Sequence, residues 1–141
     1  MSAKPFGLAV KALVKDAQGR CLLIRRSQES KHFRGQWDLP GGKVDSGEDF
    51  TSALYREAGE EIGLKVSITG VAGAAEYEMP AVRVVLLFLE ARLESEQVTL
   101  SNEHDAYLWV PLAELPQMNL SDQLRPFLEK YVKANERKIA D

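Results

Sequence analysis

Acidic side chains crowd the segment from residue 42 to residue 64. Within it, Glu57, Glu60 and Glu61 have the i, i+3, i+4 spacing that brings side chains onto adjoining parts of one helix surface. Three carboxylates placed in this way offer hard oxygen ligands, which suit Mg²⁺ or Mn²⁺, whereas Zn²⁺ favours histidine or cysteine. The spacing therefore predicts a divalent-cation site built from carboxylates.

The position of these acids on a helical wheel supports this prediction. Steps of about 100° per residue place Glu57 and Glu61 about 20° to either side of Phe50. The same stripe contains Ala53 and Leu54, so both carboxylates fall within the apolar side of the helix. Burying two carboxylates together without a cation costs several kcal/mol each, and we therefore expect a bound cation between them.

Two other interpretations of the segment are a solvated helix face and a purely structural acidic helix that pairs with another subunit. A solvated face would place the acids opposite Phe50, and a pairing helix would show no dependence on divalent metal. Arg56 lies beside Glu60 on the wheel and eight residues from Glu48. We assign Arg56 to the catalytic set as the residue that neutralises and orients the acids.

This segment resembles the Nudix box. The pattern of a glycine, five residues, a glutamate, seven residues, then Arg-Glu-x-x-Glu-Glu-x-Gly and an apolar residue runs without a gap from Gly42 to Leu64. A mild departure is Ala58, where the family usually has a larger aliphatic residue. The likeness continues through residues 21–26, 37–42 and 107–115, and so covers nearly the whole chain.

The resemblance implies an α+β fold, namely the Nudix-type α/β/α sandwich with a mixed β-sheet and a loop-helix-loop catalytic box. It also implies a magnesium-dependent hydrolase of phosphoric anhydrides that cuts the diphosphate linkage of a nucleoside-phosphate substrate, with Mn²⁺ as a second usable cation. The matching metal ligands are Glu57, Glu60 and Glu61, and the carbonyl of Gly41 often joins them in the family.

Hydrolysis of a doubly anionic linkage needs cations to neutralise its oxygens and a positioned, partly deprotonated water. The candidates for the general base are a glutamate of the box, with Glu57 and Glu60 in the catalytic set, and Glu103 in a later loop. Some Nudix enzymes carry a metal-binding or base glutamate at the place of Glu103. The alternative is that Glu103 is an ordinary solvated acid.

Phosphate binding should come from the basic residues that precede and enter the box. Arg26 and Lys43 are our first choices among the cations concentrated between residues 25 and 43 of a net acidic protein. For Lys31 and Arg34 we favour an ordinary solvated position.

Substrate choice must come from outside the box. Residues 76–80 and Asn119 look similar to the MutT-like branch, which hydrolyses nucleoside triphosphates to the monophosphate and pyrophosphate. Some members place an asparagine that hydrogen-bonds the base where Asn119 stands, although a turn residue before a helix cap is the alternative. We expect a (d)NTP pyrophosphohydrolase. The alternatives are a pyrophosphatase of ADP-ribose or another nucleotide sugar and, from another class, a non-catalytic nucleotide-binding Nudix module, which the full set of carboxylates disfavours.

The elements that must position these residues follow from apolar periodicity and turn signals. We expect a hairpin of residues 8–14 and 21–24, a polar loop over 27–36 and a sharp turn at Pro40-Gly41-Gly42. A helix over 49–62 ends at Gly63, and a last helix begins near Ser121 or Asp122 as N-cap. Further strands are expected over residues 37–39, 66–77, 82–93 and 107–110.

The bulk composition fits this assignment. The chain has 141 residues, of which 45% are hydrophobic and 28% are charged, and we expect a single domain over residues 1–141. Its net charge of −3 disfavours long nucleic acids and anionic membranes, so the expected partner is a small-molecule nucleotide, with a homodimer left open. We expect a cytoplasmic protein, because the longest apolar run, residues 84–89, is too short to span a bilayer. Cys21 lies in an apolar run, which favours a buried structural thiol.

Overall fold

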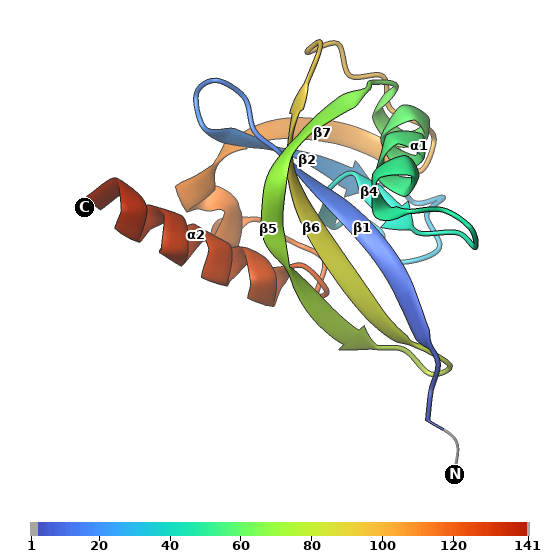
Figure 1. The fold of residues 1–141 in the computed structure, drawn as a ribbon. Helices are drawn as coiled ribbons and strands as arrows, with labels where there is room; N and C mark the ends of the chain where they lie inside the picture. The colour runs from blue at the N-terminus through green and yellow to red at the C-terminus, as the bar shows by residue number, and fades with distance from the viewer. Residues whose placement is uncertain (1–2, 141) are drawn as a thin grey trace.

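Two β-sheets form the middle layer of the protein, and a helix covers each side of this layer (Figure 1). The computed structural model describes residues 3–140. The mixed four-stranded sheet has the order β4-β1-β6-β5, and the antiparallel three-stranded sheet has the order β3-β2-β7. In chain order the elements are β1 (Phe6–Val14), β2 (Arg20–Arg26), β3 (Trp37–Asp38), β4 (Gly41–Lys43), α1 (Phe50–Ile62), β5 (Val66–Glu78), β6 (Arg83–Leu93), β7 (His104–Pro111), the 3₁₀ helix η1 (Leu112–Gln117) and α2 (Arg125–Ala140).

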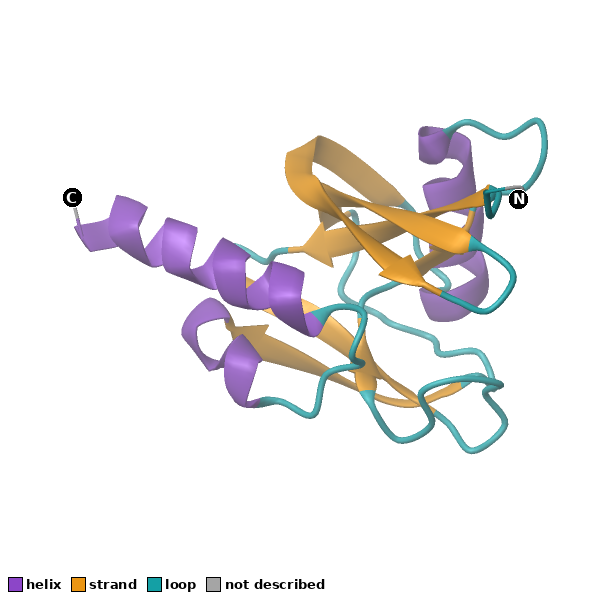
Figure 2. Ribbon diagram, turned by 90° about the horizontal axis from the view of Figure 1, so that it is seen from below, coloured by secondary structure: helices purple, strands orange, loops and turns teal. Residues whose placement is uncertain are grey.

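Strand β1 is covered on both faces, which explains its nearly continuous apolar sequence. Ala9 and Leu13 pack in the cluster that also contains residues of α2, whereas Val10, Ala12 and Val14 pack in the cluster that contains residues of α1. Seen from below, α1 and α2 lie on opposite sides of the four-stranded sheet (Figure 2). The predicted α+β class and the α/β/α sandwich with a mixed sheet are therefore confirmed.

Helix α1 is fixed at both ends by local interactions. The side chain of Asp49 caps the helix by accepting a hydrogen bond from the Ser52 N–H at 2.7 Å. Gly63 ends the helix in the left-handed conformation, with φ 67°, which glycine adopts without steric cost. The apolar residues that the wheel placed on one side are buried, namely Ala53, Leu54, Ala58 and Ile62. The predicted helix over 49–62 is confirmed apart from its capping residue.

The predicted hairpin of residues 8–14 and 21–24 is wrong. Strands β1 and β2 belong to different sheets, and the only pairing at this turn is an isolated bridge between Lys15 and Cys21. Asp16 forms the turn by accepting hydrogen bonds from the backbone of Gln18 and Arg20. The strands then separate because β1 pairs with β4 and β6 while β2 pairs with β3 and β7, and these partners are distant in sequence.

The last helix also differs from the prediction. It begins at Arg125, which leaves both predicted N-cap residues, Ser121 and Asp122, in the turn before the helix, and the buried hydroxyl of Ser121 has no hydrogen-bond partner. Strand β4 and the 3₁₀ helix η1 were not expected, since neither short segment shows periodicity, and β7 begins at His104 instead of Tyr107. Cys21 is buried, as expected, and burial raises the pKa of its thiol to about 12.

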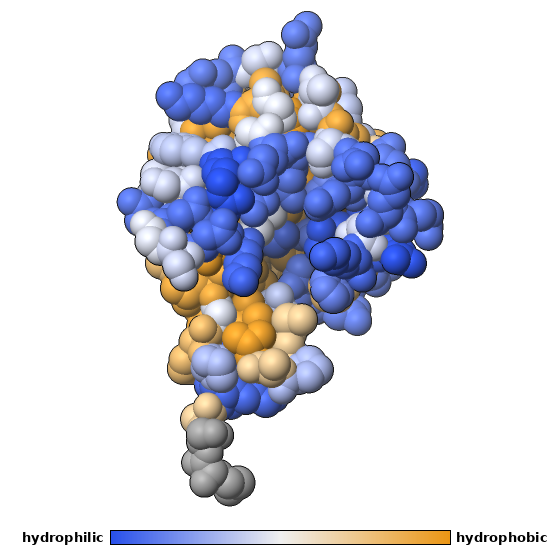
Figure 3. Space-filling view, turned by 90° about the vertical axis from the view of Figure 1, so that its right-hand side faces the viewer, coloured by the Kyte–Doolittle hydropathy of each residue, from blue (hydrophilic) through white to orange (hydrophobic). Residues whose placement is uncertain are grey.

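Apolar surface gathers near the start of β1 (Figure 3). Phe6 and Leu8 are exposed there, and most of the remaining surface of this face is polar. Among the helices in the described residues, none has both the length and the apolar character needed to cross a membrane.

Candidate functional site

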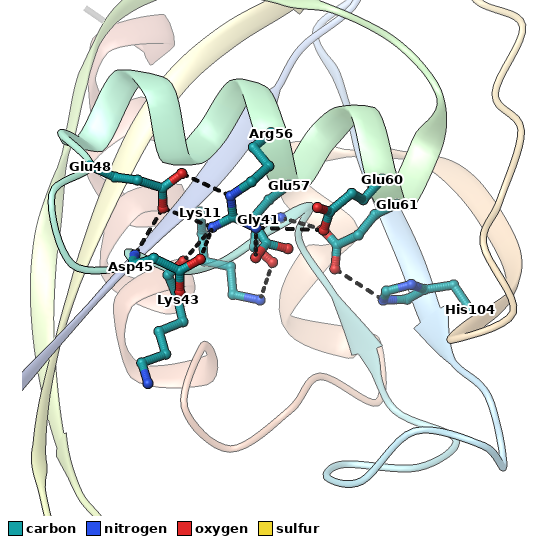
Figure 4. A network of polar contacts seen from close by, with 10 residues as sticks. All are labelled: Lys11, Gly41, Lys43, Asp45, Glu48, Arg56, Glu57, Glu60, Glu61 and His104. Atoms are coloured by element: carbon teal, nitrogen blue, oxygen red, sulfur yellow. Dashed lines mark hydrogen bonds and ion pairs between the residues drawn. The ribbon is translucent and has the colours of Figure 1, made fainter.

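Glu61 is a buried acid on the inner side of α1. Glu61 is only 6% exposed. Its Oε1 accepts a hydrogen bond from the Gly41 N–H at 2.7 Å (Figure 4). Burial raises the pKa of the Glu61 carboxyl to about 8, although Lys11 and the Gly41 N–H act in the opposite direction. The wheel argument for Glu61 is therefore confirmed, and the solvated-face interpretation is wrong for this residue.

Glu57 lies one helical turn earlier and packs directly on β4. A Cβ built on Gly42 would lie 2.7 Å from the carboxyl carbon of Glu57, so only glycine leaves room for this side chain. The Arg56 Nη1 donates to Glu57 Oε1 at 3.0 Å. Desolvation raises the pKa of Glu57, and the neighbouring Arg56 limits that rise. Glu57 is thus a partly buried acid next to a glycine of the box.

Arg56 joins the start of the box to its helix. Its Nε and Nη2 donate to the two carboxylate oxygens of Glu48 at 2.8 and 2.9 Å, and its Nη2 also donates to the Lys43 carbonyl at 3.0 Å. The hydrogen bonds from Arg56 to Glu48, together with one from the Asp45 N–H, lower the pKa of Glu48 to about 2. Arg56 therefore contacts the acids that its sequence position suggested, including Glu60 at 3.5 Å.

Glu60 is the most exposed of the three box acids, and its Oε2 lies 3.5 Å from the same Arg56 Nη1 that donates to Glu57. Its side chain is 60% exposed, and among the side chains of residues 3–136 no three acidic, histidine or cysteine groups converge closely enough to enclose a metal ion. The available donors nevertheless suit a hard cation, because they are carboxylate and carbonyl oxygens and because Glu57 and Glu61 are desolvated. The ligand roles of Glu57, Glu60, Glu61 and Gly41 stay predictions.

A buried ion pair that the sequence interpretation missed lies beside these acids. Lys11 is 4% exposed and Asp38 is fully buried, and the Lys11 Nζ lies 3.1 Å from Asp38 Oδ2. The Arg26 Nε lies 3.5 Å from the same oxygen. The available signal was the single lysine within the apolar run of β1, since a charge in a doubly covered strand requires a partner.

His104, and not Glu103, lies next to the box acids. The His104 ring is buried, and its Nε2 lies 4.0 Å from Glu61 Oε2. Desolvation and then the charge of Arg26 lower the pKa of His104 to about 4, so the ring is neutral at pH 7. Glu103 is exposed and lines a small pocket of about 300 Å³ together with Arg26. Glu103 lies in the turn before β7 and His104 is the first residue of that strand, so the two side chains have different surroundings. The base or metal role of Glu103 stays a prediction.

A cavity of about 680 Å³ opens beside β4. Its polar lining includes both predicted phosphate-binding residues, Arg26 and Lys43, together with Lys11. Its apolar lining comes from the start of β1 and from the facing ends of β5 and β6, with Leu8, Tyr77, Met79, Val82 and Val84 among the residues. The cavity therefore has a cationic side near the box and an apolar side near the strand ends.

The structure places Asn119 outside this cavity. Asn119 is exposed, and its carbonyl accepts a hydrogen bond from the Trp37 N–H at 2.8 Å. Gln123, which the sequence interpretation did not consider, lines the cavity instead. No motif marks Gln123, because only the path of the chain between η1 and α2 brings it there. Base recognition by Asn119 stays a prediction.

Comparisons with known proteins agree with this architecture. The family model of the NUDIX domain matches residues 5–131. The chain is 27% identical over 134 residues to the CTP pyrophosphohydrolase of Escherichia coli (strain K12), covering 95% of this chain and 98% of that protein. It is 34% identical over 106 residues to the putative 8-oxo-dGTP diphosphatase 2 of Mycobacterium tuberculosis (strain ATCC 25618 / H37Rv), covering 70% of each. Among solved structures, the MutT protein from Methanosarcina mazei Go1 is similar with a TM-score of 0.85 and 34% identity, over 96% of this chain and 99% of that chain.

Proposed function

The chain belongs to the Nudix family, and from this membership we propose that it is a magnesium-dependent hydrolase that converts nucleoside triphosphates into the monophosphate and pyrophosphate. The relatives at 27% and 34% identity are described as a CTP pyrophosphohydrolase and a putative 8-oxo-dGTP diphosphatase, which supports a nucleoside triphosphate as the substrate class. The same chemistry is accessible to Mn²⁺, which shares the preference of Mg²⁺ for oxygen ligands.

The position of Gly42 is the observation that carries the proposal. Gly42 packs against the Glu57 carboxylate and also lines the cavity that holds Arg26 and Lys43. Gly42 therefore lies between the Glu57 carboxylate of α1 and the cavity. A polyphosphate bound by the two basic residues would lie beside the carboxylates, as hydrolysis of its linkage requires.

The residues that would hold the cation are Glu57, Glu60, Glu61 and the carbonyl of Gly41. When bound, Mg²⁺ neutralises phosphate oxygens and lowers the pKa of a coordinated water. The positively charged guanidinium of Arg56 donates hydrogen bonds to Glu48 and Glu57 and so limits the repulsion among the acids.

The side chains around the cavity have separate tasks. Arg26 and Lys43 bind the phosphates through charge-assisted hydrogen bonds. The apolar side, which includes Tyr77 and Val84, excludes water and receives the nucleoside. Glu57 accepts the proton of the attacking water, with Glu103 as the alternative base, because a partly buried carboxylate of raised pKa is a better base than an exposed one.

The test is to incubate the protein with MgCl₂ and a panel of ribo- and deoxyribonucleoside triphosphates and ADP-ribose, and to measure pyrophosphate and phosphate separately. We expect pyrophosphate and a monophosphate from the triphosphates, and no product in EDTA. Glu61→Gln should lower kcat on the order of 100-fold, while the exposed loop variant Glu96→Gln should keep wild-type turnover. Release of phosphate alone, or preferred cleavage of ADP-ribose, would contradict the substrate class. Wild-type activity of Glu61→Gln would contradict the site.

A further inference from the structure

The ammonium group of Lys11 donates three hydrogen bonds to oxygens next to the box, one in a carboxylate and two in backbone carbonyls. Its Nζ donates to Asp38 Oδ2 at 3.1 Å and to the Leu39 carbonyl at 3.4 Å. It also donates to the Gly41 carbonyl at 3.4 Å (Figure 4). An ammonium group has three N–H donors and no acceptor. Although Lys11 borders the cavity, its hydrogen-bonding capacity is filled by the protein, which argues against a role in contacting substrate directly.

These contacts connect Lys11 to the acids of α1 through Gly41. The N–H of Gly41 donates to Glu61, and its carbonyl accepts from Lys11, so the same residue touches the ammonium and the buried carboxylate. Gly41 has φ 138°, and a Cβ there would lie 2.1 Å from the Val10 carbonyl. The backbone at this point is therefore held in one position relative to β1.

Asp38, Glu57 and Glu61 lie around this point, and cations of the protein face them. Asp38 and Glu61 are buried acids, and Lys11 and Arg26 are the cations that face them from β1 and β2. The positive charge of Lys11 opposes the rise in the pKa of both Glu57 and Glu61. Because Coulomb interactions are strong in a desolvated interior, removing this one cation would leave an excess of buried negative charge.

We propose that Lys11 is a positioning residue that serves as an internal counter-cation, stabilising the Gly41 turn and the carboxylates of α1 while no divalent cation is bound. The ammonium contacts the Gly41 carbonyl, which is also one of the expected metal ligands, so it and a divalent cation would compensate the same acids. This inference rests on the proposed function insofar as that function places a divalent cation at the box acids.

A thermodynamic cycle of mutation and metal tests the proposal. Unfolding midpoints are measured at one fixed pH, with MgCl₂ or with KCl of equal ionic strength. Lys11→Met should lower the midpoint in KCl and should show a larger rise on adding MgCl₂ than the wild type, equivalent to Mg²⁺ binding on the order of 10-fold tighter. Lys11→Arg keeps the charge and should restore the wild-type response.

Two further variants keep the test decisive. Lys15→Met removes a partly buried lysine of the same region, whose Nζ pairs with Glu90, and should lower stability without changing the response to MgCl₂. If Lys11→Met fails to fold because Asp38 is left without its partner, the comparison is made between Asp38→Asn and the Lys11→Met/Asp38→Asn double variant, with the same expectation. An equal or smaller response to MgCl₂ on loss of Lys11 overturns the role of Lys11 alone. No response in any protein, wild type included, overturns both this role and the metal site of the proposed function.

Discussion

Glu61 and His104 lie next to each other, and burial shifts their pKa values in opposite directions. Burial raises the pKa of the Glu61 carboxyl to about 8 and lowers that of the His104 ring to about 4. Both groups are therefore favoured in their neutral forms in the metal-free protein. At the residue scale, burial therefore disfavours the negative charge of Glu61.

This arrangement predicts how the stability of the metal-free protein depends on pH. Between the ordinary carboxyl pKa of 4.5 and about 8, the folded state keeps a proton on Glu61 that the unfolded chain has released. The contribution of Glu61 to stability is therefore complete below pH 4.5 and is lost as the pH rises toward 8. The lowered pKa of His104 acts in the opposite sense, but only from its ordinary value of 6.5 down to about 4. The range from pH 6.5 to 8 therefore reports Glu61.

In EDTA, we expect the free energy of unfolding to fall by up to about 1.4 kcal/mol per pH unit between pH 6.5 and 8. Urea denaturation at closely spaced pH values measures this slope. Glu61→Gln should flatten it, whereas Glu96→Gln should keep it. An unchanged slope in Glu61→Gln would show that another group causes the dependence.

At the scale of the element, α1 and β4 fit each other through glycine. Gly42 leaves space for the Glu57 carboxylate, whereas the space around Gly59 on the exposed side of α1 is open. The same substitution should therefore have opposite consequences at the two positions.

Gly42→Ala should lower kcat by about 10- to 100-fold, because its Cβ displaces the Glu57 carboxylate and small displacements of catalytic groups are costly. Gly59→Ala should keep activity and raise the free energy of unfolding by about 0.5–1 kcal/mol, since alanine is the better helix former. Steady-state kinetics and urea denaturation of both variants provide the comparison. Equal activity of the two variants would mean that Glu57 tolerates displacement.

At the scale of the whole molecule, the cavity is assembled from parts that are distant in sequence. Lys43 comes from the box, Tyr77 from the end of β5, and Gln123 from the segment before α2. The cationic side and the apolar side of the cavity therefore come together only in the folded sandwich. Substrate selectivity should depend on residues such as Gln123 that do not belong to the box.

Gln123→Ala should reduce the preference for the best nucleobase over a poor one by about 1–3 kcal/mol, as expected on removing a polar partner from a recognition pocket. Asn119→Ala should have the smaller effect, because Asn119 does not line the cavity. The measurement is kcat/KM for two nucleotides that differ only in the base. A larger effect of Asn119→Ala would restore Asn119 as the residue that reads the base.

The sequence by itself determined the features that depend on neighbours along the chain. The end of α1 at Gly63 and the inward direction of Glu57 and Glu61 follow from local backbone conformation and helical periodicity. The cluster of fixed residue types in the box was also sufficient to indicate the family. These features need no knowledge of which strands pair.

Only the tertiary structure decided the features that depend on strand pairing. It separated β1 from β2 into different sheets, and it placed Lys11 against Asp38, twenty-seven residues later in the chain. It also brought His104 instead of Glu103 to Glu61, and Gln123 instead of Asn119 to the cavity. The positions of Lys11 and His104 depend on the register between distant strands, because a shift by one residue turns each side chain to the opposite face. The position of Gln123 depends on the path of the chain between η1 and α2, which no local pattern specifies.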